Sequence, residues 1–433
     1  MLYFSGKRLR MEVYEELEKR GFIYQVTDPL LKKVLNQEQV TFYAGFDPTA
    51  DSLHIGNLLV IMGMVHLQRA GHRPIAVVGG GTGLIGDPSG KSKERPLMSR
   101  EQIEKNLEGI KAQLEHFLHY GEGSAELIMV NNLDWLGELN LIEFLRDIGK
   151  HFRLSEMLAR ESVKLRLESE EGISFTEFCY QLLQAYDFLH LFDQYQCRLQ
   201  VGGSDQWGNI TAGIDLIRRL RQAQAYGLTF PLVTTASGAK FGKTEQGTVW
   251  LDPKKTSPYQ FYQYWIQTDD RDVVRYLKYF TLLPLSEIEE LAQLVKTEPE
   301  KRTAQKRLAF EITSMVHSRD QAEQVERASQ LLFYEKLENL SDQELLMVFD
   351  QAPSYQVNKS ELEKGVALLD LLERAKIFPS RTEAKRKIKE GGVYLNQQRI
   401  TDLNYQLSLK DLASEHFIVI RVGKKKYHLI RID

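Results

Sequence analysis

Strand-like and helix-like hydrophobic patterns follow one another in the first third of the chain. Residues 39–46 alternate between polar and apolar positions and are rich in β-formers, which predicts a strand. Residues 55–70 carry an apolar stripe with helical spacing, and Gly71 stands where a helix C-cap belongs. Residues 74–78 predict the next strand. This order makes a βαβ unit, which builds parallel sheets with ligand sites at the carboxyl ends of the strands.

The pattern changes twice farther along the chain. Residues 127–130 and 198–201 are further short strand candidates, whereas residues 259–280 and 300–334 are helical with little strand signal. Beyond Lys364 the pattern predicts two helices and two strands, at residues 367–376, 382–390, 393–395 and 417–421. We therefore predict an α/β domain at 1–230, a helical domain at 231–350, a linker at 351–365 and a small α+β module at 366–433.

Length and composition indicate an ordinary globular protein with several domains. A chain of 433 residues is too long for one hydrophobic core, and 42% apolar with 27% charged residues excludes a disordered chain. No run of about 18 apolar residues occurs, so we expect no membrane span. The first ten residues are charged and lack a long apolar core, which argues against a secretory signal. The cytoplasm is the expected compartment.

The two cysteines and the charge distribution add two constraints. Cys179 and Cys197 cannot form a disulfide framework, and no Cys/His cluster has zinc-ligand spacing, so we expect no protein metal site. From Val366 onward there are 14 Lys and Arg residues against 8 Asp and Glu residues, a net charge of about +6. The total is −3, so the remainder carries about −9. A basic end on an acidic body indicates either a polyanion partner or a solvated charged face.

A polar turn between the first predicted strand and helix, at residues 43–57, is the first candidate site. His54 opens the helix, and the free N–H groups and positive dipole end of a helix suit a phosphate. Gly56 would let an adenine ring approach the backbone closely. A lone histidine in such a turn is more often part of a capped turn than of a site, so this segment needs support from elsewhere.

The sequence Lys240-Phe241-Gly242-Lys243-Thr244 is the second candidate site. Two mobile ammonium groups on a glycine-containing loop can close over a triphosphate and meet charge that develops during reaction. Taken alone, such a pair is more often a solvated surface loop.

Together the two segments resemble the two signatures of class I aminoacyl-tRNA synthetases, His-Ile-Gly-His and Lys-Met-Ser-Lys-Ser. The similarity is closest to the bacterial-type tyrosyl-tRNA synthetase family and runs through almost the whole chain, with further matching segments at residues 83–88, 144–152, 173–178 and 202–209. The resemblance implies a Rossmann-like parallel-sheet catalytic domain, then the signature loop with an α-helical anticodon-side domain, and finally a small α+β S4-like RNA-binding domain.

The resemblance also implies an activity and its partners. An enzyme of this family would use ATP to activate L-tyrosine as tyrosyl-adenylate, release pyrophosphate, and transfer the tyrosine to the 3′ end of tRNA(Tyr). ATP would be a substrate, and Mg²⁺ would enter with it rather than at a dedicated protein site. Relatives are homodimers in which one tRNA bridges both subunits. The apolar-aromatic character of residues 144–152 and Phe175 fits such an interface, although it fits internal packing equally well.

Carried over position by position, the resemblance implies a tyrosine pocket. Tyr43 and Asp187 would form hydrogen bonds with the phenolic hydroxyl of the substrate. The substrate ammonium group would be held by Asp87, Tyr180 and Gln184. Gln206 would lie near the substrate carboxylate and the α-phosphate.

The same resemblance implies an ATP site beside that pocket. His54 and Thr49 would contact the γ-phosphate in the transition state. The leaving pyrophosphate would be stabilised by Lys91, Arg95, Lys240 and Lys243. ATP and the adenylate would be bound by Asp47, Gly56, Asn57, Gly203, Asp205 and Lys243.

The residue types suit this chemistry, with two departures from the family pattern. The attacking carboxylate is already ionised, so the reaction needs positioning and charge stabilisation rather than a general base. Asn57 replaces the second histidine of the first signature, and its amide can still donate a hydrogen bond to a ribose or ring oxygen. Ala44 stands where some relatives carry a cysteine beside the ribose, so one weak contact is absent.

Two glycine-rich patterns near residue 85 imitate other nucleotide-binding proteins. Residues 81–86 match G-x-G-x-x-G, the dinucleotide fingerprint of a dehydrogenase. Asp87-Pro88 follows at once, however, where the phosphate-binding helix should run, and no second strand ending in an acid appears about 20 residues later. Residues 86–92 imitate a P-loop but have one residue too few between the glycines.

A non-catalytic RNA-binding protein on the same scaffold is the alternative of a different class. Residues 380–389 resemble the basic helix of the S4 RNA-binding fold, which would bind phosphates by charge with little base reading. The expected tRNA contacts are Arg381, Lys385, Arg386, Lys389, Lys424, Lys425 and Lys426. A decayed enzyme should have lost Asp87, Asp187 or the loop lysines, and all of them are present.

Overall fold

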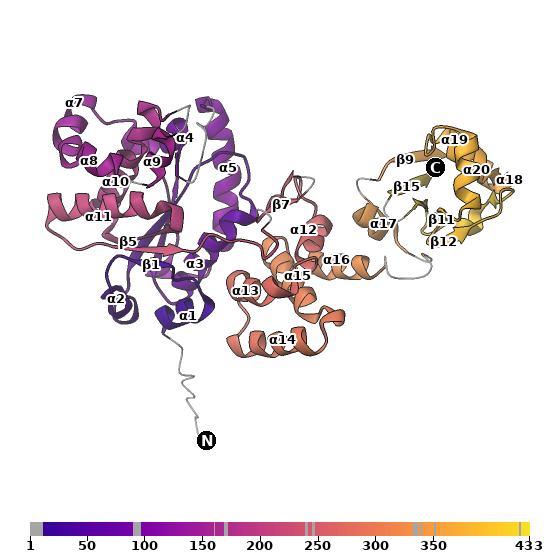
Figure 1. Ribbon diagram of the computed structural model, residues 1–433, viewed down its shortest axis with the longest axis horizontal. Helices are drawn as coiled ribbons and strands as arrows, with labels where there is room; N and C mark the ends of the chain where they lie inside the picture. Colours follow the sequence, from indigo (N-terminus) through magenta and orange to yellow (C-terminus); the bar gives the residue numbers. More distant parts are fainter. Residues whose placement is uncertain are drawn as a thin grey trace, which may run out of the picture. The chain divides into compact units, whose positions relative to one another are not determined.

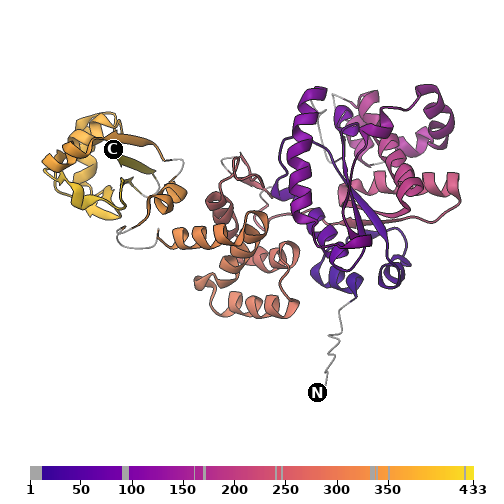
Figure 2. The same ribbon diagram turned by 180° about the vertical axis from the view of Figure 1, so that it is seen from behind.

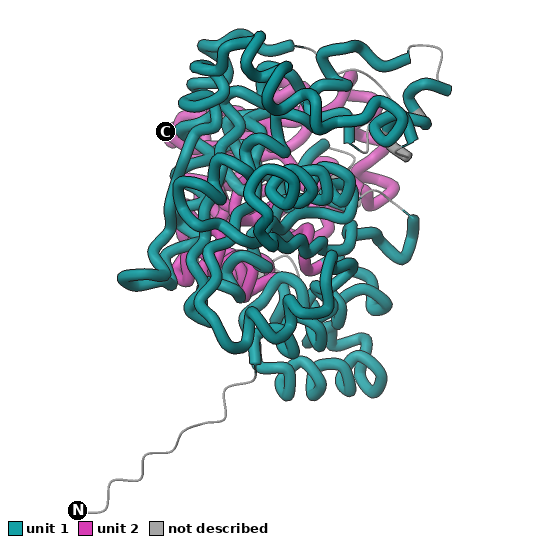
Figure 3. The backbone as a smooth tube through the Cα atoms, turned by 90° about the vertical axis from the view of Figure 1, so that its left-hand side faces the viewer, with its two compact units in different colours: residues 1–256, 267–308 teal, residues 257–266, 309–433 magenta. Residues whose placement is uncertain are grey.

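The computed structural model describes residues 12–89, 97–159, 161–168, 172–238, 241–244, 247–331, 337, 340–349, 352–423 and 426–433. The chain divides into two compact units, coloured separately in Figure 3. The first unit comprises residues 1–256 and 267–308, and the second comprises residues 257–266 and 309–433.

A six-stranded sheet forms the centre of the first unit (Figure 1). Its order is β1-β6-β5-β2-β3-β4, where β1 is Gln25–Val26, β2 is Thr41–Phe46, β3 is Arg73–Val78, β4 is Ile128–Asn131, β5 is Cys197–Gly203 and β6 is Tyr226–Phe230. Five strands are parallel, and only β1 at the edge is antiparallel. The chain builds outward from β2 through β3 to β4 and then returns to place β5 on the other side of β2. That reversal is the topological switch point, where parallel sheets of this kind bind ligands.

Helices cover both faces of the sheet. Helices α10 (Phe175–Tyr195) and α11 (Trp207–Arg221) pack on the face that carries Tyr43, Ile75 and Val77. The other face receives α3 (Leu58–Arg69), which packs against α5 (Arg100–Phe117). Figures 1 and 2 show α10 and α11 in magenta on one side of the sheet and α5 in purple on the other. The two-faced burial explains why the central strands are almost continuously apolar.

The first unit also contains shorter elements around the sheet and two helices that follow it in the sequence. Among the described residues before 250, its other α-helices and strands are α1 (Val13–Arg20), α2 (Leu31–Gln37), α4 (Thr82–Ile85), α6 (Leu133–Leu136), α7 (Leu141–Glu143), α8 (Leu154–Leu158), α9 (Glu161–Leu167), β7 (Lys243–Thr244) and β8 (Gly247–Thr248). Helices α13 (Asp270–Phe280) and α14 (Leu285–Thr297) follow. The buried guanidinium of Arg20 donates hydrogen bonds to the carbonyls of Thr281 and Leu283, and α13 packs on α3. These contacts attach part of the expected helical domain, 231–350, to the α/β unit.

The second unit contains a helical part and a small α+β module. The helices are α12 (Pro258–Ile266), α16 (Arg319–Leu331) and α17 (Asp342–Phe349), and α15 (Thr303–Val316) begins in the first unit. The module has the sheet order β12-β11-β14-β15-β9 with helices α18 (Lys359–Lys364), α19 (Leu368–Arg374) and α20 (Arg381–Lys389). The strands are β9 (Ser354–Val357), β11 (Val393–Leu395), β12 (Gln398–Ile400), β14 (Phe417–Val422) and β15 (Lys426–Ile432). A two-stranded pair, β10 (Val366–Ala367) with β13 (Gln406–Leu407), completes it.

The strands and helices expected from the hydrophobic pattern are present within one to three residues at most boundaries. The stretch 351–365, expected to be a linker, instead carries α18 and also β9, which pairs in parallel with β15. Its alternating Ser354–Val357 run is short and lies next to a proline, so its strand character depends on a partner more than 70 residues away. In the part of the chain that the structure describes, no helix is both long and apolar enough to cross a membrane.

Candidate active site

A cleft of about 810 Å³ opens at the carboxyl ends of β2 and β5, at the switch point of the sheet. It is lined by all thirteen described residues expected to contact tyrosine or ATP: Tyr43, Asp47, Thr49, His54, Gly56, Asn57, Asp87, Tyr180, Gln184, Asp187, Gly203, Asp205 and Gln206. Helical spacing explains why three of these side chains lie together. Tyr180, Gln184 and Asp187 are four and three residues apart and therefore share one face of α10.

Asp187 is a buried carboxylate at the α10 wall of the cleft. Its side chain is held from two directions, because Asn132 Nδ2 donates to Oδ2 at 2.9 Å and Trp135 Nε1 donates to Oδ1 at 2.7 Å. Asn132 is itself fixed, since its Oδ1 accepts the backbone N–H of Gly81 at 2.8 Å. A carboxylate oxygen can accept more than one hydrogen bond, so Asp187 can still bind a further donor.

Burial sets the electrostatics of this part of the cleft. It raises the pKa of Asp187 to about 8, and the hydrogen bonds from Asn132 and Trp135 oppose that rise. Burial also raises the pKa of Tyr43 well above its usual value, and the nearby Asp187 adds to this effect. The Tyr43 hydroxyl is buried without a hydrogen-bond partner among the described residues. A buried hydroxyl without a partner is unfavourable, and a bound ligand could supply the missing hydrogen bond.

Asp47, directly after β2, links the α10 wall to the turn after β3. The Tyr180 hydroxyl donates to Asp47 Oδ2 at 2.8 Å, and the Thr82 hydroxyl donates to Oδ1 at 2.7 Å. Burial raises the pKa of Tyr180 well above its usual value, and the carboxylates of Asp47 and Asp87 add to the rise. Tyr180 therefore stays a neutral hydrogen-bond donor throughout the ordinary pH range.

A chain of polar side chains connects Asp87 with the end of β5. Gln206 Nε2 donates to Asp87 Oδ2 at 2.8 Å, and the backbone N–H of Ser89 donates to Oδ1 at 2.9 Å. Asn209 Nδ2 donates to Gln206 Oε1 at 3.2 Å and to Gln184 Oε1 at 3.0 Å. This network orients two amides and one carboxylate toward the same volume, which suits recognition of an amino acid's ammonium and carboxylate groups.

The first signature segment is a capped turn that fixes a histidine tautomer. The backbone N–H of Gly56 donates to His54 Nδ1 at 3.1 Å, and the backbone N–H of His54 donates to Asn57 Oδ1 at 3.1 Å. Because Nδ1 accepts a hydrogen bond, the proton of the imidazole resides on Nε2. A Cβ atom at Gly56 would lie 2.8 Å from His54 Cε1, so only glycine leaves this ring in place.

The two signature segments, almost 190 residues apart in sequence, lie against each other. A Cβ atom placed on Gly242 would be 3.1 Å from Ile55 Cγ1 and 3.7 Å from the backbone nitrogen of Gly56. The backbone N–H of Val249 donates to Gly242 O at 3.0 Å, and the N–H of Ile55 donates to Val249 O at 3.1 Å. The loop that carries the second signature is therefore bound through its backbone to the segment that carries His54.

Four of the expected catalytic side chains lie outside the described part of the chain. Lys91, Arg95 and Lys240 lie outside the described residues, as does the side chain of Lys243, whose backbone belongs to β7. Among the described residues, no three His, Cys, Asp or Glu side chains come together as metal ligands would.

Several residues of the site were missed by the sequence analysis. Asn132 and Trp135 hold Asp187, Thr82 binds Asp47, and Asn209 orients Gln184. A signal existed for Asn132, because it directly follows a strand whose carboxyl end borders the site. Trp135 carries no comparable local signal, since only the packing of α6 against α10 brings its indole to Asp187.

The glycine pattern that imitated a dinucleotide fingerprint has a different structure. Residues Thr82–Ile85 form only the four-residue helix α4, which ends at Gly86 with φ of +87°. The chain then turns at Asp87, whose carboxylate takes part in the polar network of the cleft. Up to residue 89, where the described segment ends, no longer helix extends from these glycines in the way a pyrophosphate-binding helix would.

The expected RNA-binding residues lie mostly on α20 of the small module. Ala384 and Ile388 face its core, while Arg381, Lys385, Arg386 and Lys389 are exposed. Arg381 and Arg386 also contact acidic neighbours, such as Asp370 and Glu390, so part of the positive charge is internally compensated. Lys426 is exposed at the start of β15, and Lys424 and Lys425 lie outside the described residues.

Comparison with known families gives matches over nearly the whole chain. The family described as "tRNA synthetases class I (W and Y)" matches residues 35–334, and the "Tyrosine--tRNA ligase SYY-like C-terminal domain" matches residues 344–430. The tyrosine–tRNA ligase of Roseiflexus castenholzii is 53% identical over 421 residues, 97% of this chain and 99% of that protein. That of Geobacillus stearothermophilus is 53% identical over 423 residues, 97% of this chain and 100% of that protein.

Solved structures of aminoacyl-tRNA synthetases are also similar to this chain. A C-terminally truncated mitochondrial tyrosyl-tRNA synthetase from Aspergillus nidulans is 34% identical, with a TM-score of 0.69 over 75% of this chain and 95% of that one. A tryptophanyl-tRNA synthetase from Encephalitozoon cuniculi, at 16% identity and a TM-score of 0.52, shares the fold.

Proposed function

The chain belongs to the class I tRNA synthetases for tryptophan and tyrosine and acts as a tyrosine–tRNA ligase, and we propose how its cleft performs that activity. The observation that carries the proposal is the shared cleft: the buried pair of Tyr43 and Asp187 lines the same cavity as His54 of the first signature. A pocket for a phenol and a site for a triphosphate are thereby adjacent.

Tyrosine recognition rests on the buried hydroxyl and carboxylate. The phenolic hydroxyl of the substrate would donate to Asp187 and accept from Tyr43, whose hydroxyl lacks a partner among the described residues. Phenylalanine would leave the buried Tyr43 hydroxyl without a partner and would give the buried Asp187 carboxylate no donor beyond Asn132 and Trp135, which disfavours it strongly. The substrate ammonium group would bind among Asp87, Tyr180 and Gln184, and Gln206 would lie near the carboxylate.

Activation needs charge stabilisation rather than proton abstraction. An oxygen of the ionised tyrosine carboxylate attacks the α-phosphorus of ATP, and the bond to pyrophosphate breaks as charge moves to the leaving group. His54 would donate its Nε2–H to the γ-phosphate, and the tautomer fixed by Gly56 supports this role. Thr49 and the basic residues Lys91, Arg95, Lys240 and Lys243 would complete the stabilisation. Asp47, Gly203, Asp205 and Asn57 would contact the ribose side of the adenylate.

We propose that Mg²⁺ arrives bound to ATP. Mg²⁺ prefers phosphate oxygens and water over an all-protein cage, and the described residues bring together no set of three ligands for it. Bound in this way it would add positive charge to the triphosphate during activation.

The second step needs a tRNA, and the basic module supplies a surface for its phosphates. The exposed side chains of α20 suit a contact made by charge. The acidic residues of this helix pair with Arg386 and Lys387, whereas Lys385 and Lys389 form no ion pair within the described part of the module. We propose that this face binds tRNA(Tyr) and that the reaction takes place in the cytoplasm, where charged tRNA is used for protein synthesis.

We also propose that the protein is a homodimer. Thirteen large hydrophobic residues are exposed in the described part of the chain, and seven lie between residues 141 and 175: Leu141, Ile142, Leu145, Leu154, Leu158, Leu167 and Phe175. Phe175, at the start of α10, is 78% exposed. A concentration of apolar side chains of this size on one stretch is typical of a subunit interface.

The test is tyrosine-dependent exchange of pyrophosphate into ATP, run beside phenylalanine. Rapid exchange with tyrosine and little with phenylalanine is the expected result. Absence of exchange, together with retained tRNA binding, would favour the non-catalytic RNA-binding alternative instead.

A further inference from the structure

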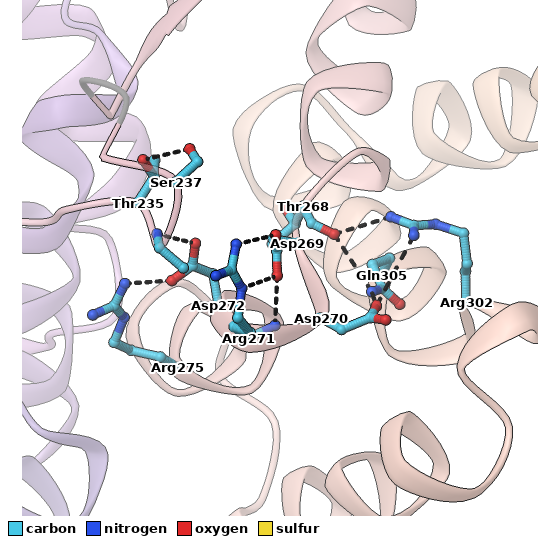
Figure 4. A network of polar contacts seen from close by, with 11 residues as sticks. Thr235, Ser237, Thr268, Asp269, Asp270, Arg271, Asp272, Arg275, Arg302 and Gln305 are labelled. Atoms are coloured by element: carbon cyan, nitrogen blue, oxygen red, sulfur yellow. Dashed lines mark hydrogen bonds and ion pairs between the residues drawn. The ribbon is translucent and has the colours of Figure 1, made fainter.

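The segment that precedes the second signature is attached to helix α13. The backbone N–H of Ala236 donates to Asp272 Oδ2 at 2.7 Å, and Arg275 Nη2 donates to the carbonyl of Thr234 at 2.6 Å. The same carbonyl accepts a hydrogen bond from the Tyr276 hydroxyl at 3.1 Å. Figure 4 shows Asp272 and Arg275 projecting from α13 toward this segment. Residues 231–233, just before it, line the cleft.

The segment returns to the same helix within the signature itself. The ring of Phe241 stacks on Phe280 with centroids 5.5 Å apart and meets Tyr276 edge-on at 5.4 Å. Gly242, the next residue, lies against Ile55 of the first signature. Helix α13 is therefore a platform that contacts the chain both before and within the second signature.

Asp272 and Arg275 also form an ion pair with each other on this helix. They are three residues apart on α13, and Arg275 Nη2 donates to Asp272 Oδ1 at 2.5 Å. Asp272 is 3% exposed, so each of its oxygens has lost water and gained one of these donors. The Asp272 end of this ion pair is buried, whereas the Arg275 side chain is 40% exposed. A partly buried ion pair contributes little net stability and is better suited to fixing a geometry. What this pair fixes is the path of residues 234–236.

We propose that Asp272 and Arg275 are positioning residues for tyrosine activation. By holding residues 234–236 they set where the chain enters the second signature, and so where the ammonium groups of Lys240 and Lys243 meet the triphosphate. The inference rests on the proposed function of those lysines and concerns residues that touch no substrate. A rigid support of this kind lowers the cost of ordering charged side chains around the transition state.

The alternative is that this pair only stabilises the start of α13. The cap of that helix is supplied by a different residue, because Asp269 accepts the backbone N–H of Arg271 at 2.9 Å. Arg271 also forms a two-point ion pair with Asp269, and it forms no hydrogen bond with the described residues of the signature segment, 234–238 and 241–242. Arg271→Gln is thus a matched control: it makes the same chemical change on the same helix turn, at a side chain that forms no hydrogen bond with the described part of the signature segment.

The experiment compares Arg275→Gln, Asp272→Asn and Arg271→Gln in the full-length protein. We measure the rate of pyrophosphate exchange, the Kd for tyrosine by fluorescence, and the thermal unfolding of each variant. Arg275→Gln should slow activation about tenfold, the worth of one charged hydrogen bond, with the Kd for tyrosine changed less than about twofold. Arg271→Gln should stay within about twofold of the parent in both. Arg275 is 40% exposed in its side chain, so this variant carries the test even where Asp272→Asn does not fold.

A mutant cycle with the double variant Lys240→Ala, Lys243→Ala separates positioning from a general loss of stability. If Arg275 acts through the loop lysines, adding Arg275→Gln to the variant that lacks both of them should cost less than about twofold further. The full tenfold loss in that background, or parent-like activation by Arg275→Gln alone, would overturn the inference. Failure of the proposed function is distinguishable, because the parent protein would then show no tyrosine-dependent exchange at all.

Discussion

Trp135 and Asp187 are joined by a 2.7 Å hydrogen bond from the indole nitrogen to the buried carboxylate. The indole also stacks on His190, with ring centroids 4.4 Å apart and an angle of 15° between the planes. Together with Asn132 these contacts hold the carboxylate at one place in the cleft wall. The Asp187 carboxylate, which we propose accepts a hydrogen bond from the substrate phenol, is therefore held in position by the protein itself.

Replacing Asp187 tests substrate selection. Asp187→Ala should reduce the preference for tyrosine over phenylalanine about 100-fold or more, because the phenol loses a buried charged acceptor. The apparent affinity for ATP should change little. Steady-state pyrophosphate exchange with both amino acids measures both quantities. Asp193→Ala, on the same helix but paired with Arg221 near its end, should leave selection intact. Unchanged discrimination in Asp187→Ala would refute the assigned role.

Tyrosine affinity should depend on pH through the same carboxylate. Burial raises the pKa of Asp187 to about 8, and a phenol donor would favour the ionised form and so lower that pKa on binding. Below pH 8 binding must then release a proton, so the Kd for tyrosine should fall by up to about tenfold per unit as pH rises from 6 toward 8. Above pH 8 the carboxylate is already ionised and the gain ends.

Calorimetry in two buffers of different ionisation enthalpy would detect the released proton. Asp187→Asn has no titrating group at this position and should lose the pH dependence. A constant Kd across pH 6 to 8 in the parent protein would contradict the linkage.

Lys243 tests the charge-stabilising part of the site. Lys243→Ala should slow adenylate formation about 100-fold, the usual effect of removing one transition-state donor, and leave tyrosine binding nearly unchanged. Rapid-quench measurement of adenylate gives the rate, and fluorescence titration gives the affinity. Lys254→Ala, an exposed lysine a few residues beyond the loop, is the control. Weaker tyrosine binding with normal activation would be the opposite of what we expect.

The basic helix of the small module can be tested without truncating the chain. The double change Lys385→Glu with Lys389→Glu should weaken binding of tRNA(Tyr) at least about tenfold and make its salt dependence shallower, since phosphate contacts release counterions. Pyrophosphate exchange should be preserved. Lys410→Glu reverses one charge, half of that change, at another exposed position of the module. Equal weakening by Lys410→Glu would indicate a diffuse charge effect rather than a binding face.

The dimer proposal has a single-residue test. Phe175→Asp places a charge on a side chain that is 78% exposed in one subunit, so the monomer should fold, whereas a buried interface would not tolerate the charge. Analytical ultracentrifugation should show the parent as a dimer and the variant as a monomer at micromolar concentration. Leu30→Asp, at another exposed apolar position, should remain dimeric. A dimeric Phe175→Asp would place the interface elsewhere.

Sequence alone determined the main helices and strands of the catalytic domain and the type of chemistry. The alternation in β2, the helical stripe of α3 and the polar turn between them are local patterns, set by side-chain spacing and capping within about fifteen residues. The two signature segments indicate a nucleotide-dependent ligase by their residues alone, without any knowledge of tertiary contacts. The C-terminal helix α20 was also recognisable, because its basic and apolar positions separate at helical spacing.

Only the tertiary structure decided which distant groups meet. Nothing local in the sequence pairs Trp135 with Asp187, places Gly242 against Ile55, or ties Ala236 to Asp272. The strand β9 likewise exists because β15 supplies its hydrogen-bond partners. Propensity and periodicity act between near neighbours, whereas these contacts depend on how the sheet and α13 bring together residues separated by tens to hundreds of positions. The side chains that orient the site are consequently visible only in the fold.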